Sequence, residues 1–342
     1  MSLRPAPAAN VATVIAIALA SWMTVSAQTS GPVGLTADQL KYRPGRPDLS
    51  KASFEVLPVQ GNVHLIVTGT GSNIVAQVGE QGAILVDASV PEASDKVLAE
   101  VRRLTKGPIR GIVDTSMDLD HIGGNANLAA AGQPMFQGNM GYLAGPSATI
   151  FAHEKGFNRI SVPGSATLQP EKLWPTDTFF TRKKKLFFNH EPIEIRWTPA
   201  LSDSNVIVWF RASDVIAAGD TFTTESYPRI DPARGGSIQG VLDALNELVD
   251  IAVPELNQQG GTRIVPAHGR IGNQSDVVEY RDMVTIVRDR VRDARTAGLS
   301  LDRIHALNVT REYDGVYATP AYTGAMFVAA VFDDLSRRAT GR

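Results

Sequence analysis

The sequence predicts an α/β protein with two similar halves that share one core, and three observations support this fold class. Groups of strand-like segments alternate with helical segments along residues 54–297. Hydrophobic residues make up 43% of the 342 residues and charged residues 20%, which is typical of a soluble globular protein with a large core. The 30 glycines and 20 prolines supply many turns, and the chain shows no internal repeat.

Charge and cysteine content exclude several classes of protein. The formal net charge is −2, so no basic field drives binding to nucleic acid, and we expect no nucleic-acid partner. The chain has no cysteine, which excludes disulfide scaffolds, cysteine-ligated zinc sites and thiol nucleophiles.

The N-terminal segment resembles a secretory signal. Val11–Ala20 is an apolar run too short to span a membrane, and Val25-Ser26-Ala27 offers small residues where a signal peptidase cuts. We therefore expect residues 1–27 to be a signal peptide, the mature chain to be periplasmic or secreted, and no membrane association after cleavage. The alternative is an uncleaved anchor. Residues 28–53 are polar and interrupted by proline and glycine, which indicates an extended lead-in.

The first half of the folded region contains short apolar segments separated by turn signals. The expected strands are Phe54–Leu57, Val63–Thr68, Asn73–Val78, Ala83–Val86 and Ile112–Asp114, and the expected helices are Ala93–Leu104 and Gly123–Ala131. Residues 132–185 carry five prolines and are expected to be loop-rich.

The second half repeats this organisation. Its expected strands are Leu186–Phe188, Ile193–Trp197, Val206–Phe210, Val215–Ala217 and Thr262–Pro266, and its expected helices are Ile238–Ile251 and Asp276–Ala297. The apolar positions of the last helix follow a 3-4-3-4 spacing, which favours a face packed on the core. We therefore divide the chain into an α/β domain over 54–272 and a helical C-terminal extension over 273–342 that packs on it.

The densest polar cluster of the chain spans residues 114–125, between an expected strand and an expected helix. Asp114, Asp118, Asp120 and His121 lie in this loop, and such a group is costly to bury without a cation. Strand-end loops are also where α/β proteins place functional sites. The alternative is a solvated turn with helix N-caps.

Two other strand ends carry metal-ligating residue types. Asp220 follows the strand that ends in Gly219, and His268 follows the strand that ends in Pro266. Together with Asp120 and His121, they would form a set of two carboxylates and two imidazoles, which suits zinc.

These motifs resemble the metallo-β-lactamase superfamily over residues 54–272. Thr115–His121, followed by Gly123-Gly124-Asn125, is similar to the family's first motif, and Pro199–Ser204 is similar to its third. Gly219-Asp220 and Pro266-Ala267-His268-Gly269 match two further motifs, and Gly79–Ala88 is similar to the hairpin before the first helix. The resemblance implies a four-layer αββα sandwich with the site at one edge between the sheets.

The resemblance also shows a degenerate first metal site. Members of the family hold one metal with three histidines, and the corresponding positions here are Ser116, Asp118 and Leu201. The second site is intact by residue type, with Asp120, His121, Asp220 and His268 as implied ligands. Asp118 is a candidate additional oxygen ligand.

Electrostatics limits what this site can hold. Asp118, Asp120 and Asp220 bring three negative charges against the two positive charges of one divalent ion. The excess needs a proton, a second cation or an Arg or Lys side chain. A second ion near Asp118 would favour Mn²⁺ or Mg²⁺, because its ligands would be oxygens.

Two functions fit the sequence. The first is an exported hydrolase in which one divalent ion activates water against an ester, amide, lactone or thioester bond of a small molecule, with Asp120 or Asp118 accepting a proton. The alternative is a catalytically silent relative that binds a ligand or partner. Asp118-Leu119-Asp120 also matches the short metal–nucleotide motif of glycosyltransferases, but the other motifs do not fit that class. Neither the substrate nor the oligomeric state follows from the sequence.

Overall fold

The computed structural model describes residues 54–69, 71–136, 145–164, 167–256 and 260–339. The expected signal peptide over 1–27 and the lead-in over 28–53 lie outside the described residues. Among the described residues, no helix combines the length and the apolar character that a membrane crossing needs.

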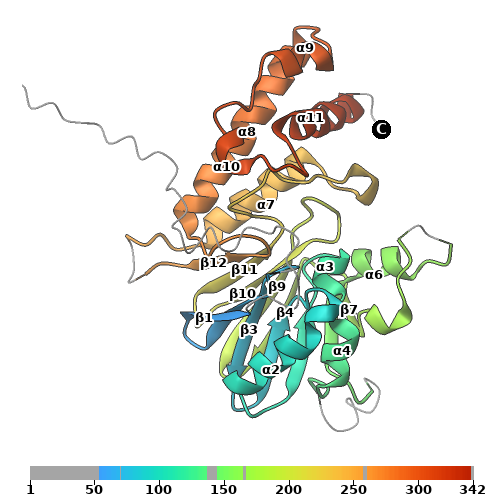
Figure 1. Ribbon diagram of the computed structural model, residues 1–342, viewed down its shortest axis with the longest axis vertical. Coiled ribbons are helices and arrows are strands. Elements are labelled where there is room, and N and C mark those ends of the chain that lie inside the picture. The colour runs from blue at the N-terminus through green and yellow to red at the C-terminus, as the bar shows by residue number, and fades with distance from the viewer. Residues whose placement is uncertain (1–53, 70, 137–144, 165–166, 257–259, 340–342) are drawn as a thin grey trace, which may run out of the picture. The chain divides into compact units, whose positions relative to one another are not determined.

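The first sheet has seven strands in the order of the sequence. They are β1 (Glu55–Gln60), β2 (Val63–Val67), β3 (Ile74–Gly79), β4 (Gly82–Val86), β5 (Ile109–Val113), β6 (Thr149–His153) and β7 (Asp177–Phe179). Strands β1 to β4 pair antiparallel, whereas β4 to β7 pair parallel. The carboxyl ends of β4, β5 and β6 therefore lie at the same edge of the sheet (Figure 1).

The second sheet has five strands in the order β12-β11-β10-β9-β8. They are β8 (Lys183–Phe188), β9 (Glu191–Trp197), β10 (Val206–Phe210), β11 (Val215–Gly219) and β12 (Arg263–Pro266). Strands β11 and β12 are parallel, so the residues that follow them, including Asp220 and His268, leave the sheet at one edge.

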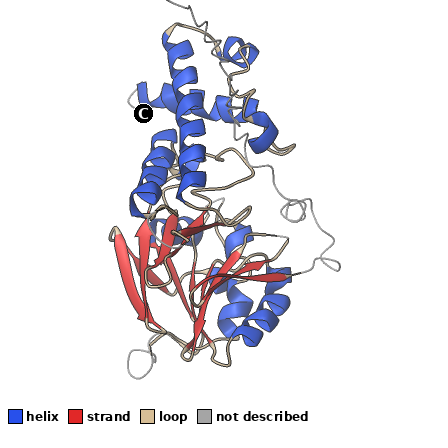
Figure 2. Cartoon of the chain, turned by 90° about the vertical axis from the view of Figure 1, so that its left-hand side faces the viewer, coloured by secondary structure: helices blue, strands red, loops and turns tan. Residues whose placement is uncertain are grey.

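Strand side chains alternate between two cores, as the period of two requires. In β4, Ile84 and Val86 face the core between the sheets, whereas Leu85 faces the core under the outer helices. In β10, Val208 joins the core between the sheets and Ile207 joins the core on the opposite face. Figure 2 shows the two sheets with helices outside them. The predicted αββα sandwich is therefore confirmed.

Helices cover both outer faces. On the first sheet lie α2 (Ser94–Leu104), α3 (Leu119–Ile122), α4 (Asn125–Ala130) and α6 (Glu154–Ser161). On the second sheet, α7 (Ile238–Ile251) and α8 (Gln274–Thr296) share a core with the C-terminal elements α9 (Leu301–Ala306), α10 (Asp314–Tyr317) and α11 (Gly324–Ala339). The short 3-10 turns are η1 (Pro91–Ala93), η2 (Glu171–Leu173) and η3 (Pro232–Arg234). The C-terminal extension is helical, as predicted, while the boundary at residue 272 stays a prediction.

The structure differs from the sequence prediction in two segments. Residues 132–185 contain β6, α6 and β7, which complete the parallel part of the first sheet. These elements are only 3 to 8 residues long and stand between prolines, so they show little periodicity. The helical turn α3 begins at Leu119, before the predicted start at Gly123, because Asp118 is already its N-cap.

Candidate metal centre

Four strand ends from the two sheets supply the residues of the site. Asp87 follows β4, and the segment from Asp114 to α3 follows β5. Asp220 follows β11, and His268 follows β12 shortly afterwards. Within each sheet the two strands are parallel and end at a common edge, and the contact between His121 and Asp220 shows that the two edges lie together.

The structure brings together Asp120, His121, Asp220 and His268, the four side chains that the sequence singles out. His121 Nε2 lies 3.1 Å from Asp220 Oδ2, and His268 Nε2 lies 3.2 Å from Asp120 Oδ2 and 3.7 Å from Asp220 Oδ1. Candidate ligand atoms of Asp120, His121 and His268 all lie within 4.8 Å of one another. The geometry matches a shared metal site, and the role of each residue as a ligand stays a prediction.

Asp87 fixes the orientation of His121. Its Oδ2 lies 3.0 Å from His121 Nδ1, and the backbone N–H and hydroxyl of Thr115 donate to the same carboxylate at 2.8 and 2.7 Å. His121 is fully buried, so this contact sets which ring nitrogen faces the cluster. A carboxylate behind a histidine is the usual support of a metal-ligating imidazole.

The remaining nitrogen of His121 is the observation that tests the fit to a metal. Nε2 is buried, and within the described part of the chain it has no partner aligned for a hydrogen bond, although Asp220 lies close to it. A buried nitrogen of this kind, surrounded by two carboxylates and a second imidazole, is satisfied by a divalent cation. The donor set therefore fits a metal ion.

Charges inside the cluster shift the titration of its members. Burial lowers the pKa of His121, but the charges of Asp220 and Asp87 outweigh burial and raise it well above the ordinary value of 6.5. Burial likewise opposes the charged form of His268, whose pKa is raised above 6.5 by its contact with Asp120 and by the charge of Asp220. In the metal-free protein, the neighbouring carboxylates thus favour the positively charged form of both imidazoles.

The cluster is accessible from solvent. The side chains of Asp120, His268 and Asp220 are 41%, 29% and 21% exposed, while His121 forms the buried floor. A small molecule can therefore reach the exposed side of the site.

Asp118 has different partners from Asp120. Ser116 Oγ donates to Asp118 Oδ2 at 3.0 Å, and the guanidinium of Arg234 binds Asp118 Oδ1. Arg234 also donates through Nε to Asp231 Oδ2 at 2.6 Å. The sequence analysis missed Arg234, because it lies 116 positions from Asp118 and belongs to no motif.

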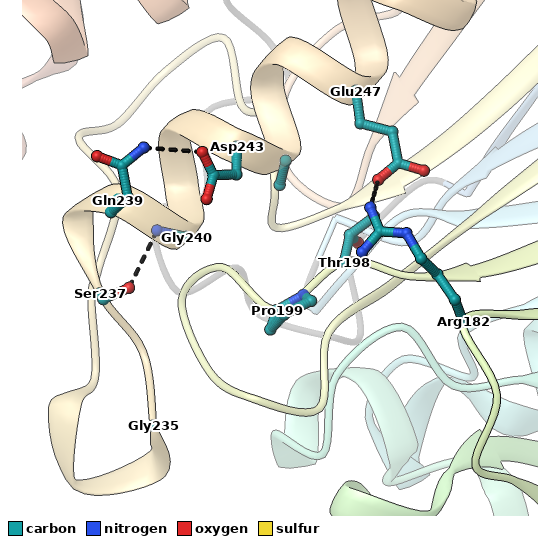
Figure 3. A pocket seen from close by; sticks show the side chains of 10 residues that line it. Arg182, Thr198, Pro199, Gly235, Ser237, Gln239, Gly240, Asp243 and Glu247 are labelled. Carbon is teal, nitrogen blue, oxygen red and sulfur yellow. Dashed lines mark hydrogen bonds and ion pairs between the residues drawn. The ribbon is translucent and has the colours of Figure 1, made fainter.

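A separate cavity of about 360 Å³ lies between the end of β9 and the start of α7 (Figure 3). Its lining includes Thr198, Ser237 and Asp243, together with Arg182 and Glu247, whose side chains pair at 2.6 Å. None of the four cluster residues lines it. The cavity borders Gly235 beside Arg234, but it is distinct from the candidate metal centre.

The αββα sandwich and the His/Asp cluster at its strand ends define a protein of the divalent-metal-binding αββα class. The sequence profile of the metallo-beta-lactamase superfamily matches residues 67–256, more than half of the chain, so the chain belongs to this superfamily. Asp120, His121 and Asp220 lie inside the matched range, and His268 lies beyond it. Membership indicates a metallohydrolase family whose fold binds divalent metal.

Solved structures share the fold with this chain. The stereoselective inverting sec-alkylsulfatase Pisa1 from Pseudomonas sp. has 15% sequence identity and a TM-score of 0.60, with 84% of this chain covered. This chain spans 50% of the length of that sulfatase. A metallo-beta-lactamase from Pontibacter korlensis has 16% identity and a TM-score of 0.50, covering 68% of this chain and 99% of the lactamase. No curated protein matches the sequence significantly.

Proposed function

We propose that the protein is an exported hydrolase that holds one zinc ion through Asp120, His121, Asp220 and His268. The observation that carries this proposal is the meeting of these side chains, from three separate loops, at contact distances of 3.1 to 3.7 Å. The substrate is a small molecule with an ester, amide, lactone or thioester bond. Asp220 and the two imidazoles suit zinc better than Mg²⁺, which prefers oxygen ligands only.

A bound divalent ion supplies Lewis acidity, which lowers the pKa of water toward ~7 and polarises a scissile carbonyl. The chain's own groups do the rest. Asp87 holds His121 in one orientation, and Asp220 and His268 close the other side of the cluster. Asp120 is 41% exposed, so we assign it the role of accepting the proton that the attacking water releases. Asp118 is the weaker candidate for this role, because Arg234 holds its carboxylate.

The alternative function is a catalytically silent relative that binds a ligand or partner. The observation that favours it is the altered first site, in which Leu201 offers no side-chain donor and Asp118 pairs with Arg234. A Mn²⁺ or Mg²⁺ ion at Asp118 would lie beside that guanidinium, whose positive charge opposes it.

Metal analysis combined with a substrate panel distinguishes the two functions. Mature protein is purified, its zinc content is measured, and turnover is tested on chromogenic esters, lactones, thioesters and β-lactams. We expect about one zinc ion per chain and turnover of at least one substrate class. His268→Ala should lose both, whereas His305→Ala, at a half-buried histidine of α9 that contacts the carbonyl of Ala325, should keep both. Absence of metal and of turnover in the unaltered protein would support the silent relative.

The export step has its own test. Expression of the full chain in a bacterial host, followed by N-terminal sequencing of the periplasmic or secreted product, should show cleavage after Ala27. Recovery of the intact chain with the membrane fraction would support the uncleaved anchor instead.

A further inference from the structure

Arg234 lies on a loop that the fold holds in one position. Asp231 caps the turn η3 by accepting from the backbone N–H of Arg234 at 3.2 Å, and Gly235 ends the turn in the left-handed region at a φ of 75°. The carbonyl of Arg234 accepts from the guanidinium of Arg159 and from the backbone N–H of Asp203, both at 2.9 Å. The backbone that carries the Arg234 side chain is therefore anchored on two sides.

This loop is also fastened to the segment after β9. The backbone N–H of Asp231 donates to the carbonyl of Leu201 at 2.9 Å, and the N–H of Ser237 donates to the carbonyl of Ala200 at 3.1 Å. A Cβ added to Gly236 would lie 1.9 Å from the Leu201 carbonyl oxygen, so the two backbones are in direct contact. The backbone of the Arg234 loop is thus packed directly on the segment that contains Leu201.

Both carboxylate oxygens of Asp118 are engaged. Oδ2 accepts from the hydroxyl of Ser116, and Oδ1 accepts from Nη1 of Arg234. The planar guanidinium of Arg234 has five N–H donors, and its Nε donates to Asp231 at the same time. This second contact fixes the orientation of the guanidinium toward Asp118. A metal ion at Asp118 would lie beside the guanidinium of Arg234, whose positive charge opposes a second cation there.

We propose that Arg234 is a positioning residue that takes the place of a second metal ion, and that it limits the centre to one divalent ion. This inference rests on the proposed function. The guanidinium of Arg234, which also pairs with Asp231, supplies positive charge at Asp118, so Asp120 and Asp220 are the two carboxylates left for an ion at the cluster. One divalent ion balances these two carboxylates, and a second ion at Asp118 would have to bind beside the positive guanidinium of Arg234.

The test measures how many metal ions are bound to each chain of the purified mature protein. Zinc-loaded protein is dialysed against Mn²⁺, and both metals are then measured by mass spectrometry. The unaltered protein should hold about one zinc ion and no manganese. Arg234→Met should keep its zinc and gain up to about one Mn²⁺ ion, because the oxygens of Asp118 and Asp231 become free. Arg234→Lys, which retains the positive charge, should not gain Mn²⁺.

Two further variants separate charge removal at this position from a general effect. In the double variant Asp118→Asn with Arg234→Met, the carboxylate is absent, so the gain of Mn²⁺ should disappear. Arg263→Met removes an arginine that pairs with Glu255 on the surface, and its metal content should equal that of the unaltered protein. Circular dichroism and thermal melting show whether each variant is folded.

The outcomes are distinct. An unaltered protein that binds two ions, or a folded Arg234→Met variant that gains no Mn²⁺, would overturn the inference while leaving the proposed metal centre intact. An unaltered protein that binds no zinc would instead overturn the proposed function.

Discussion

The support of His121 by Asp87 leads to a prediction whose size follows from the structure. In the unaltered protein, the backbone N–H of Thr115 donates to Asp87 Oδ1 at 2.8 Å, and the Oδ1 of asparagine in Asp87→Asn can still accept this hydrogen bond. Asparagine also tolerates the left-handed φ of 65° at this position. The change removes the negative charge that lies 3.0 Å from His121 Nδ1. The variant should therefore fold while its buried imidazole loses its anchor.

We expect Asp87→Asn to weaken zinc binding. A hydrogen bond to a charged group contributes about 1.5–3 kcal/mol, and loss of a carboxylate behind a ligating histidine weakens metal binding about 10- to 100-fold, or about 1.4–2.7 kcal/mol. Competition with a chromophoric chelator measures the Kd for zinc. Asp177→Asn removes a carboxylate that pairs with Lys184 at 2.8 Å away from the cluster, and it should leave the Kd unchanged. An Asp87→Asn variant that binds zinc as tightly as the unaltered protein would refute the reasoning.

Three other outcomes are expected. The pKa values of His121 and His268 are both raised above 6.5 in the metal-free protein, so their stabilising charge is complete below 6.5 and is lost as the pH rises through the raised values. Zinc binding at pH 7 should therefore release on the order of one to two protons, seen by calorimetry in buffers of different ionisation enthalpy, and zero release would contradict these charge states. Gly219→Ala should lower the free energy of unfolding by roughly 1–3 kcal/mol in a denaturant titration, because Gly219 has a φ of 55° and an added Cβ would lie 2.7 Å from Thr115 Oγ1. An unchanged midpoint of the unfolding transition would show that alanine fits this turn without strain. Chelation should lower stability by about 2.7 kcal/mol from a state with free zinc at ~100 times its Kd, and a melting temperature insensitive to chelation would argue against a structural contribution of the metal.

Local patterns in the sequence predicted an α/β protein with polar residues at several strand ends, and the resemblance to the metallo-β-lactamase superfamily implied the four layers. Strand β10 is apolar throughout, which indicates burial on both faces, and the structure places Val208 in one core and Ile207 in the other. Asp220 and His268 were found because each directly follows a buried strand, and parallel strands end at a common edge. These patterns suggested that the strand ends could converge, whereas the meeting of the two sheets at one edge was implied by the resemblance.

The partners that tune the site could not be predicted in the same way. Asp87 was visible as the residue after a strand, but its contact with His121 depends on a left-handed backbone conformation that no local pattern specified. Arg234 reaches Asp118 from a loop that is held by backbone contacts to Leu201 and Asp203. Charge counting predicted that the three carboxylates need a proton, a second cation or an Arg or Lys side chain. Only the fold shows that Arg234 pairs with Asp118.

Zinc K-edge X-ray absorption on the loaded protein tests the central claim most directly. Asp120, His121, Asp220 and His268 around one ion predict a shell of nitrogen and oxygen ligands at about 2.0–2.2 Å, with imidazole scattering and no second metal at about 3.5–4 Å. In His268→Ala the imidazole contribution should fall by about half. A spectrum without imidazole scattering, or one that His268→Ala leaves unchanged, would contradict the assignment of these four residues.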